Sequence, residues 1–158
     1  MNKRNAILCA LLASIMPVLV SCGTKSLKDI KMTSCNVSSF TPKGLTSFDA
    51  TVDLGVDNPS VQFALSKMYA VVKMNGSPCI HLTADDVTIA PRTEQVYPLT
   101  LHGTMDGGFN PFSLLGLLEG SGLEQMTIDV KYHGALKSGL GKDFEYKDIP
   151  LTDLIDRL

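Results

Sequence analysis

The sequence predicts an all-β protein, a seven-stranded antiparallel β-sandwich with one short helix. Three stretches carry this prediction, because apolar and polar side chains alternate along them as in a strand with one buried face. They are residues 48–56, 97–102 and 126–133. The side chains expected to face the core are Phe48, Val52, Leu54, Val56, Leu99, Leu101, Ile128 and Val130. Seven short strands in ~135 residues fit two antiparallel sheets packed face to face.

Four weaker strands complete the count. They span residues 31–38, 67–74, 79–84 and 144–149. Between the second and the third lies Asn75-Gly76, a dipeptide that favours positive φ angles and a tight reversal. We therefore expect 68–74 and 79–84 to form a β-hairpin. Together the strands predict a sandwich of the immunoglobulin/fibronectin III-like type.

One segment, residues 109–120, interrupts the alternation and predicts a short helix. Asn110 suits the N-cap, Pro111 the first helical position and Gly120 the position just past the end. The leucines of this segment are more typical of core packing than of membrane contact. We expect the helix to cover one end of the sandwich.

The first 21 residues are typical of a secretory signal. Lys3 and Arg4 form a charged segment, and the apolar run 6–20 has the length of a signal-peptide core and is shorter than a membrane-spanning helix. The sequence Leu19-Val20-Ser21-Cys22 then resembles the lipobox of bacterial lipoproteins. That resemblance implies lipidation of the Cys22 thiol, cleavage before it and acylation of the new amino group. The alternatives are a conventional signal or an uncleaved signal anchor, followed by a coincidental cysteine.

A lipidated Cys22 divides the chain into a signal peptide (1–21), a lipidated cysteine with a short linker (22–29) and a domain (30–158). Two or three acyl chains form a stable membrane anchor, whereas one chain holds a protein only marginally. Gly23 stands where Asp would resemble an inner-membrane retention signal, so the expected location is the periplasmic face of the outer membrane. A Gram-positive source would change this location to the outer face of the single membrane.

The linker between the expected anchor and the domain is short. As a flexible coil, residues 23–29 span ~15 Å. The domain is therefore expected to lie against the bilayer or a neighbouring envelope protein, and its function is expected to depend on the tether.

The net charge argues against nucleic-acid binding. The chain has 14 basic and 16 acidic residues, a formal charge of −2. Loss of residues 1–21 removes Lys3 and Arg4 but no acidic residue, which leaves the mature chain at −4. Such a chain has no surplus of cations with which to neutralise phosphates.

Besides the lipidated one, two cysteines remain in the mature domain. Cys35 shares a strand face with Val37 and is expected to point inward. Cys79 lies on the face opposite Ile80 and Leu82 and is expected to point outward. This arrangement favours a buried thiol and a half-exposed thiol over a disulfide, although two cysteines in an oxidising compartment leave one bridge open.

The order of elements resembles the late embryogenesis abundant group 2 family, also called the water stress and hypersensitive response domain. The likeness spans residues 30–151. Its elements are a long alternating strand ending in Val56-Asp57-Asn58-Pro59-Ser60, a strand with an Asn-Gly turn, a link at Ala90-Pro91, an apolar strand at 96–101, a leucine-rich helix and a closing strand ending near Tyr132-His133-Gly134. The resemblance implies a seven-stranded sandwich with one helix, no catalytic residues, and a role in stress tolerance or in membrane and partner interaction.

Asn58-Pro59 is the sharpest element of this likeness. Pro59 cannot donate a hydrogen bond to a strand ladder, and it biases Asn58 toward extended geometry. The Asn58 side chain can then satisfy backbone groups where the strand ends. We expect the pair to be a structural motif.

We find no catalytic or metal-binding constellation in the sequence. His81, His102 and His133 fall on the polar sides of different strands and are expected to be independent and exposed, whereas a zinc site needs three or four converging ligands. Asp85-Asp86 lacks the oxygen-rich loop of a calcium site and is expected to form a solvated turn. Residues 103–108 lack the spacing of a phosphate-binding loop. No enzymatic activity, metal or cofactor is expected.

These observations predict a non-enzymatic, membrane-tethered lipoprotein. It would act as a binding or structural module in the envelope or in stress tolerance, with the membrane and an envelope protein as partners. The alternative is a carrier that holds a small hydrophobic ligand between the sheets under the helix.

Overall fold

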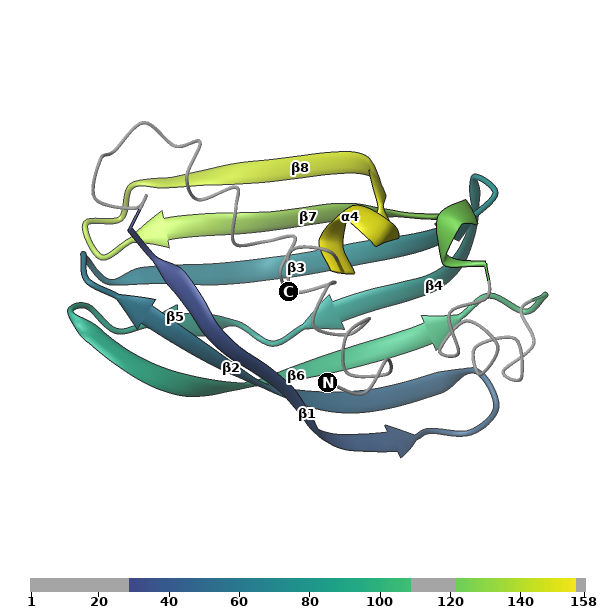
Figure 1. Ribbon diagram of the computed structural model, residues 1–158, viewed down its shortest axis with the longest axis horizontal. Helices are drawn as coiled ribbons and strands as arrows, with labels where there is room; N and C mark the ends of the chain where they lie inside the picture. Colours follow the sequence, from purple (N-terminus) through teal and green to yellow (C-terminus); the bar gives the residue numbers. More distant parts are fainter. Residues whose placement is uncertain (1–28, 109–121, 156–158) are drawn as a thin grey trace.

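The computed structural model describes residues 29–108 and 122–155 of the chain. Cys22, the expected signal peptide and the expected helix at 109–120 therefore lie outside the described residues. Figure 1 shows the described part as a set of long strands with little helix. In chain order its elements are β1 (Lys31–Pro42), β2 (Ser47–Asn58), β3 (Phe63–Met74), β4 (Ser77–Ala84), β5 (Val87–Ile89), β6 (Thr93–Met105), the 3-10 helix η1 (Leu123–Gln125), β7 (Met126–Leu136), β8 (Gly141–Pro150) and α4 (Leu151–Ile155).

The predicted all-β, antiparallel class is confirmed. Every strand pair is antiparallel, and each of the seven expected strands is present. The short strand β5 is additional. It pairs with residues 63–65 of β3, while β4 pairs with residues 68–74 of the same strand. The weak strand predicted at 67–74 is thus the second half of a longer strand whose edge is shared by two partners.

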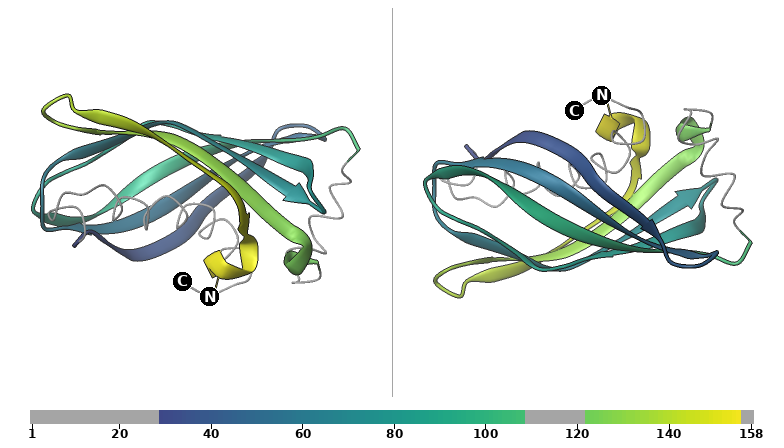
Figure 2. Two further views of the ribbon diagram at one scale, coloured as in Figure 1. Left: turned by 90° about the horizontal axis from the view of Figure 1, so that it is seen from above. Right: turned by 90° about the horizontal axis from the view of Figure 1, so that it is seen from below.

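One hydrogen-bonded sheet contains all the described strands, in the order β1-β2-β6-β4-β3-β7-β8, with β5 beside β3. The sequence predicts two sheets, but β4 pairs with both β3 and β6 and so joins the two halves. The sheet twists strongly, so that the edge strands β1 and β8 cross obliquely when seen from above or below (Figure 2). Such twist is the normal consequence of strand geometry, and it lets a single sheet curve around a core.

The core lies on the concave side of this sheet. All eight side chains that the sequence assigns to the core are at most 7 % exposed, which confirms that part of the prediction. Tyr132, Ile89 and Leu151 are as deeply buried, and Leu151 brings the start of α4 into the core. In the described ranges 29–108 and 122–155, no helix is long and apolar enough to cross a membrane.

The predicted hairpin of β3 and β4 is also confirmed. Met74 pairs with Ser77, and the two residues between them, Asn75 and Gly76, have φ angles of 50° and 80°. Asn and Gly reach such angles most easily, which is why this dipeptide predicts the turn.

Cys79 is buried, so the expectation of a half-exposed thiol is wrong. Its side chain is 4 % exposed, and its Sγ donates to the carbonyl of Val72 at 3.2 Å. The register between β3 and β4 shifts between Val72 and Lys73, and beside this irregularity Cys79 and Ile80 are both buried. Burial raises the pKa of the Cys79 thiol. Because the Cys79 thiol is free, no disulfide joins it to Cys35. Cys35 is buried as expected, but it is disulfide-bonded, so the expectation of a thiol there is wrong.

The strand connections gather at two opposite ends of the sheet (Figure 1). The Lys31 end holds the start of β1 and the connections 59–62, 90–92 and 137–140. The Leu45 end holds the turns 43–46 and 75–76 together with η1.

Candidate functional site

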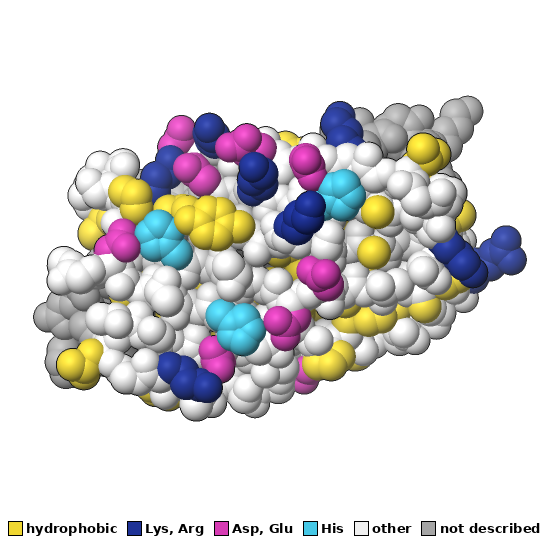
Figure 3. All heavy atoms as spheres, turned by 180° about the vertical axis from the view of Figure 1, so that it is seen from behind, with side chains coloured by type: hydrophobic (Ala, Val, Ile, Leu, Met, Phe, Trp, Pro, Cys, Tyr) yellow, Lys and Arg dark blue, Asp and Glu magenta, His cyan; other side chains and the backbone are white. Residues whose placement is uncertain are grey.

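Polar side chains cover the convex side of the sheet, which we call the outer face (Figure 3). Strand alternation places them there, since their neighbours in sequence are buried on the other side. Histidines and carboxylates gather on this face, and its principal residues are Asp49, Tyr69, Lys73, His81, His102, Asp129, His133 and Asp143. It is the only part of the described chain where several titratable side chains contact one another, so we treat it as the candidate site.

His102 lies between two carboxylates. It is directly opposite Asp49 in the β2–β6 ladder, and its Nδ1 is 2.8 Å from the Asp49 Oδ1. Its Nε2 is 3.3 Å from the Asp85 Oδ1. The hydrogen bond with Asp49, supported by the one with Asp85, raises the pKa of His102. In turn, hydrogen bonds from His102 and Lys43 lower the pKa of Asp49.

Tyr69, His81 and Asp106 form a hydrogen-bonded chain. The Tyr69 hydroxyl is 2.8 Å from the His81 Nδ1, and the His81 Nε2 is 3.1 Å from the Asp106 Oδ1. The chain has the order of groups found in proton relays. It stands on the open surface of the sheet, however, where Tyr69 is 41 % exposed, whereas such a relay acts in catalysis together with oxyanion donors and walls that exclude water.

His133 has a single carboxylate partner. It is directly opposite Asp143 in the β7–β8 ladder, and its Nδ1 is 2.6 Å from the Asp143 Oδ1. The hydrogen bond from His133 lowers the pKa of Asp143.

The three histidines do not converge. They contact different aspartates, and in the described part of the chain no group of three or more metal-ligating side chains is placed to hold a metal ion. Asp85 and Asp86 do not form a calcium loop either. Asp85 bonds to His102, and Asp86 accepts the backbone N–H of Lys67.

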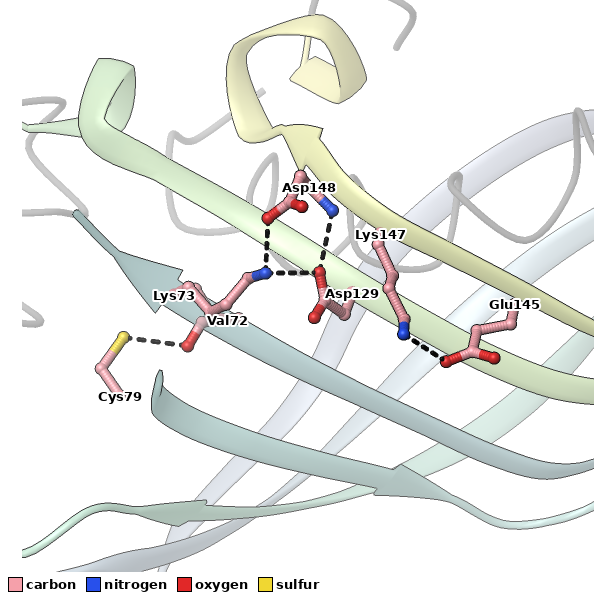
Figure 4. Close-up of polar contacts among 7 residues, drawn as sticks. All are labelled: Val72, Lys73, Cys79, Asp129, Glu145, Lys147 and Asp148. Atoms are coloured by element: carbon pink, nitrogen blue, oxygen red, sulfur yellow. Dashed lines mark hydrogen bonds and ion pairs between the residues drawn. The ribbon is translucent and has the colours of Figure 1, made fainter. Parts of the chain in front are cut away.

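Lys73 joins two aspartates from different strands (Figure 4). Its Nζ is 2.8 Å from the Asp129 Oδ1 and 2.5 Å from the Asp148 Oδ1. The β7–β8 register shifts opposite Asp129, and Asp148, with a φ angle of 56°, turns its N–H onto the same Asp129 oxygen at 2.8 Å. Hydrogen bonds to the two carboxylates raise the pKa of Lys73. Burial raises the pKa of Asp129, but the bonds from Lys73 and Asp148 outweigh it and the pKa is lowered.

Asn58 is completely buried at the end of β2. Its Nδ2 donates to the carbonyls of Val61 and Ala90 at 2.9 and 2.8 Å, and its Oδ1 accepts the N–H of Ser60 at 3.0 Å. Three backbone groups from two connections are satisfied by one side chain. Asn58 therefore holds the β2–β3 and β5–β6 connections together at the Lys31 end.

The sequence identifies the side chains of the outer face but not their partners. Lys73, Asp129 and Asp148 come from three strands, and nothing in their local sequence marks them as a cluster. The only sequence signal for the pairs is that all these residues fall on the polar sides of predicted strands. The register that makes them meet exists only in the folded sheet.

Comparison with protein-family models found no match, and comparison with curated protein sequences found none either. Two solved structures illustrate the likenesses found. A protein from Archaeoglobus fulgidus aligns with 74 % of this chain and 97 % of its own, at 12 % identity and a TM-score of 0.44. A beta-glucuronidase from glycoside hydrolase family 2 aligns with 73 % of this chain but 11 % of its own, at 13 % identity and a TM-score of 0.35. No family membership follows from these likenesses.

Proposed function

We propose that the protein is a non-enzymatic, lipid-anchored module of the bacterial cell envelope that binds or supports another envelope component. The observation that carries the proposal is the sequence Leu19-Val20-Ser21-Cys22 behind a charged and apolar leader. Acylation at Cys22 would concentrate a small domain at a membrane surface, where tethering raises the effective concentration of a partner site.

The outer face supports a structural rather than a catalytic use of its polar side chains. Asp49, Asp129 and Asp143 each accept a hydrogen bond from a cationic or histidine side chain of the same chain. Carboxylates engaged in this way hold strands together and are less available as bases. This pattern supports the proposal that the domain acts by presenting a stable surface.

The proposed role in stress tolerance rests on the resemblance to the late embryogenesis abundant group 2 family. The proposed location is the periplasmic face of the outer membrane, and it rests on Gly23 following Cys22. Separation of inner and outer membranes on a density gradient, followed by detection of the protein, tests that location.

Replacement of the lipobox cysteine tests the anchor directly. The full chain is expressed in a bacterium that processes lipoproteins, with an alkyne-tagged fatty acid in the medium. Cys22→Ala should abolish the label and leave an unprocessed precursor. Cys9→Ala is the matched control, because it removes a cysteine from the apolar leader and should leave both label and processing intact. A Cys22→Ala protein that is labelled and processed like the parent would refute the proposal.

Native mass spectrometry of the detergent-extracted protein separates the module from a carrier. A module should be observed as the lipidated chain, alone or with a protein partner. A second lipid or another small hydrophobic molecule that stays bound at constant stoichiometry would instead support the carrier.

A further inference from the structure

The point where the chain enters the described domain decides which part of the domain can reach the membrane. β1 begins at Lys31, at one extreme of the sheet (Figure 1). Eight residues, 23–30, separate the proposed anchor Cys22 from Lys31. However they are arranged, they span at most ~28 Å. The Lys31 end is therefore held near the bilayer by any anchor at Cys22.

The opposite end is one strand length farther away. β1 and β2 are each 12 residues long, which corresponds to ~40 Å at the usual rise of a strand. A domain that stands on its Lys31 end thus holds the turn 43–46 well above the bilayer.

Apolar side chains protrude from the connections at the Lys31 end. Val61, in the β2–β3 connection, is 45 % exposed, and Leu140, in the β7–β8 turn, is 72 % exposed. Single exposed apolar residues are common on protein surfaces and do not by themselves indicate a binding site. Val61 and Leu140, however, lie in neighbouring connections at the end where the tether enters. Both can therefore contact the same apolar surface, that of the bilayer.

The charges at this end are compatible with a lipid surface. Its connections carry Arg92 and Lys137 and no acidic residue, whereas the Leu45 end carries Lys43 together with Glu124 and, just after β6, Asp106. Acidic residues do lie on or beside the strands that lead into the Lys31 end, namely Asp29, Asp57 and Glu94. The end is thus close to neutral overall, so the contact would depend on its apolar side chains more than on its charge.

We propose that the Lys31 end docks on the bilayer that holds the Cys22 anchor, with Val61 and Leu140 inserted at the boundary between headgroups and acyl chains. Residues inserted in this way penetrate the interface by ~5–10 Å. The proposal rests on the lipid anchor proposed above and adds the orientation of the domain on the membrane.

A single tryptophan can report this orientation, because the chain contains none. The full-length, lipidated variant Leu140→Trp is reconstituted into vesicles of phosphatidylethanolamine and phosphatidylglycerol, with or without lipids brominated near the top of the acyl chain. Leu45→Trp is the matched control, since Leu45 is also a turn leucine and is 84 % exposed at the opposite end. We expect brominated lipid to quench the indole of the Leu140→Trp variant strongly, and its emission to lie to the blue of that in detergent. The emission of the Leu45→Trp variant should be unchanged.

A third reporter tests whether the domain lies on its side. Tyr69→Trp places the indole on the outer face, where the parent residue is 41 % exposed. Equal quenching of the Leu140→Trp and Leu45→Trp variants, or strongest quenching of Tyr69→Trp, would overturn the proposed orientation. High salt should leave the quenching of the Leu140→Trp variant in place, since the contact is mainly apolar, and loss of that quenching would overturn the apolar contact.

Amide hydrogen exchange of the unsubstituted lipidated protein gives an independent measurement. Exchange in 59–62 and 137–140 should slow in vesicles relative to detergent, with no change in 43–46. The mass of the same samples shows whether Cys22 is acylated. An unacylated protein would refute the anchor and the docking together, whereas an acylated protein without quenching or protection would refute the docking alone.

Discussion

The two faces of the sheet are held by different kinds of interaction. On the inner face, Val52, Val56 and Ile128 are fully buried in one apolar core. On the outer face, His102, Lys73 and His133 each meet particular carboxylates at hydrogen-bond distance. Apolar burial makes no demand on direction, whereas a hydrogen bond needs its partner at one place.

This difference indicates which substitutions each face of the sheet tolerates. A side chain of the inner face needs only to be apolar and of similar volume. A side chain of the outer face can be replaced freely unless it is paired, and then the effect depends on how far the pair is shielded from water. Charge should therefore be far more damaging inside than outside.

The largest effect is expected from a charge on the inner face. Val52→Asp buries a carboxylate without a partner, and the free energy of unfolding should fall by several kcal/mol, comparable with the whole stability of an ordinary domain. Thermal unfolding of the full chain in detergent, followed by circular dichroism, measures it. Thr83→Asp is the control, because Thr83 is exposed on the outer face opposite His102. Similar melting temperatures for the two variants would contradict the assignment of the faces.

The second largest loss of stability is expected at Asn58, a polar side chain that is completely buried. Asn58→Ala leaves the carbonyls of Val61 and Ala90 and the N–H of Ser60 without their partner. Buried groups left unsatisfied lower stability by about 1–3 kcal/mol, so a loss in the upper part of this range is expected in denaturant unfolding. Asn36→Ala changes an exposed Asn of β1 and should be nearly neutral. Equal stability of the two variants would show that the three bonds contribute nothing.

The Lys73 cluster should show a smaller but measurable coupling. Lys73 is 14 % exposed and bonds to Asp129 and Asp148, whereas Lys147 and Glu145 form a pair that is more than half exposed on both sides. A double-mutant cycle of Lys73→Met and Asp129→Asn should therefore give a favourable interaction energy that exceeds the one from Lys147→Met and Glu145→Gln. The reverse order would mean that shielding from water does not govern the pairs of this face.

The smallest expected effect is a pH dependence of stability. The pKa of His102 in the folded protein is raised above its ordinary value of 6.5, so its stabilising contribution is fully present below pH 6.5 and is lost as pH rises through the folded pKa. His102→Gln should remove this decline. Asp49, whose pKa is lowered from 3.8, contributes above that pH, and its contribution is lost as pH falls through the folded pKa. The free energy of unfolding of the parent and of His102→Gln is measured as a function of pH across neutrality. If the two proteins show the same dependence on pH, the role of His102 is contradicted.

Local pattern accounts for much of what could be predicted. Val52 and Ile128 could be assigned to the core because alternation is visible within one strand, and the Asn75-Gly76 turn could be placed because two adjacent residues suffice to form it. At the candidate site, the pattern likewise shows that His102 lies on the polar side of its strand. It does not show Asp49, which is 53 residues away in sequence.

The predictions fail where the pairing between strands, and not the pattern within one strand, decides the structure. Cys79 is buried because the ladder between β3 and β4 shifts beside it, and such a shift cannot be seen in either strand alone. β5 was not predicted because three residues are too few to show an alternation of apolar and polar side chains. It forms because the first half of β3 has an edge that β4 leaves unpaired.

The sequence by itself determined the seven longer strands and most of the side chains that face inward, because both properties repeat every second residue along the chain. Only the tertiary structure decided that β2 lies beside β6 and β3 beside β7, and that β4 joins all the strands into one sheet. It also decided which aspartate each histidine and Lys73 would meet. The physical reason is that strand pairing is a contact between segments far apart in sequence, whose register is chosen by the packing of the whole core.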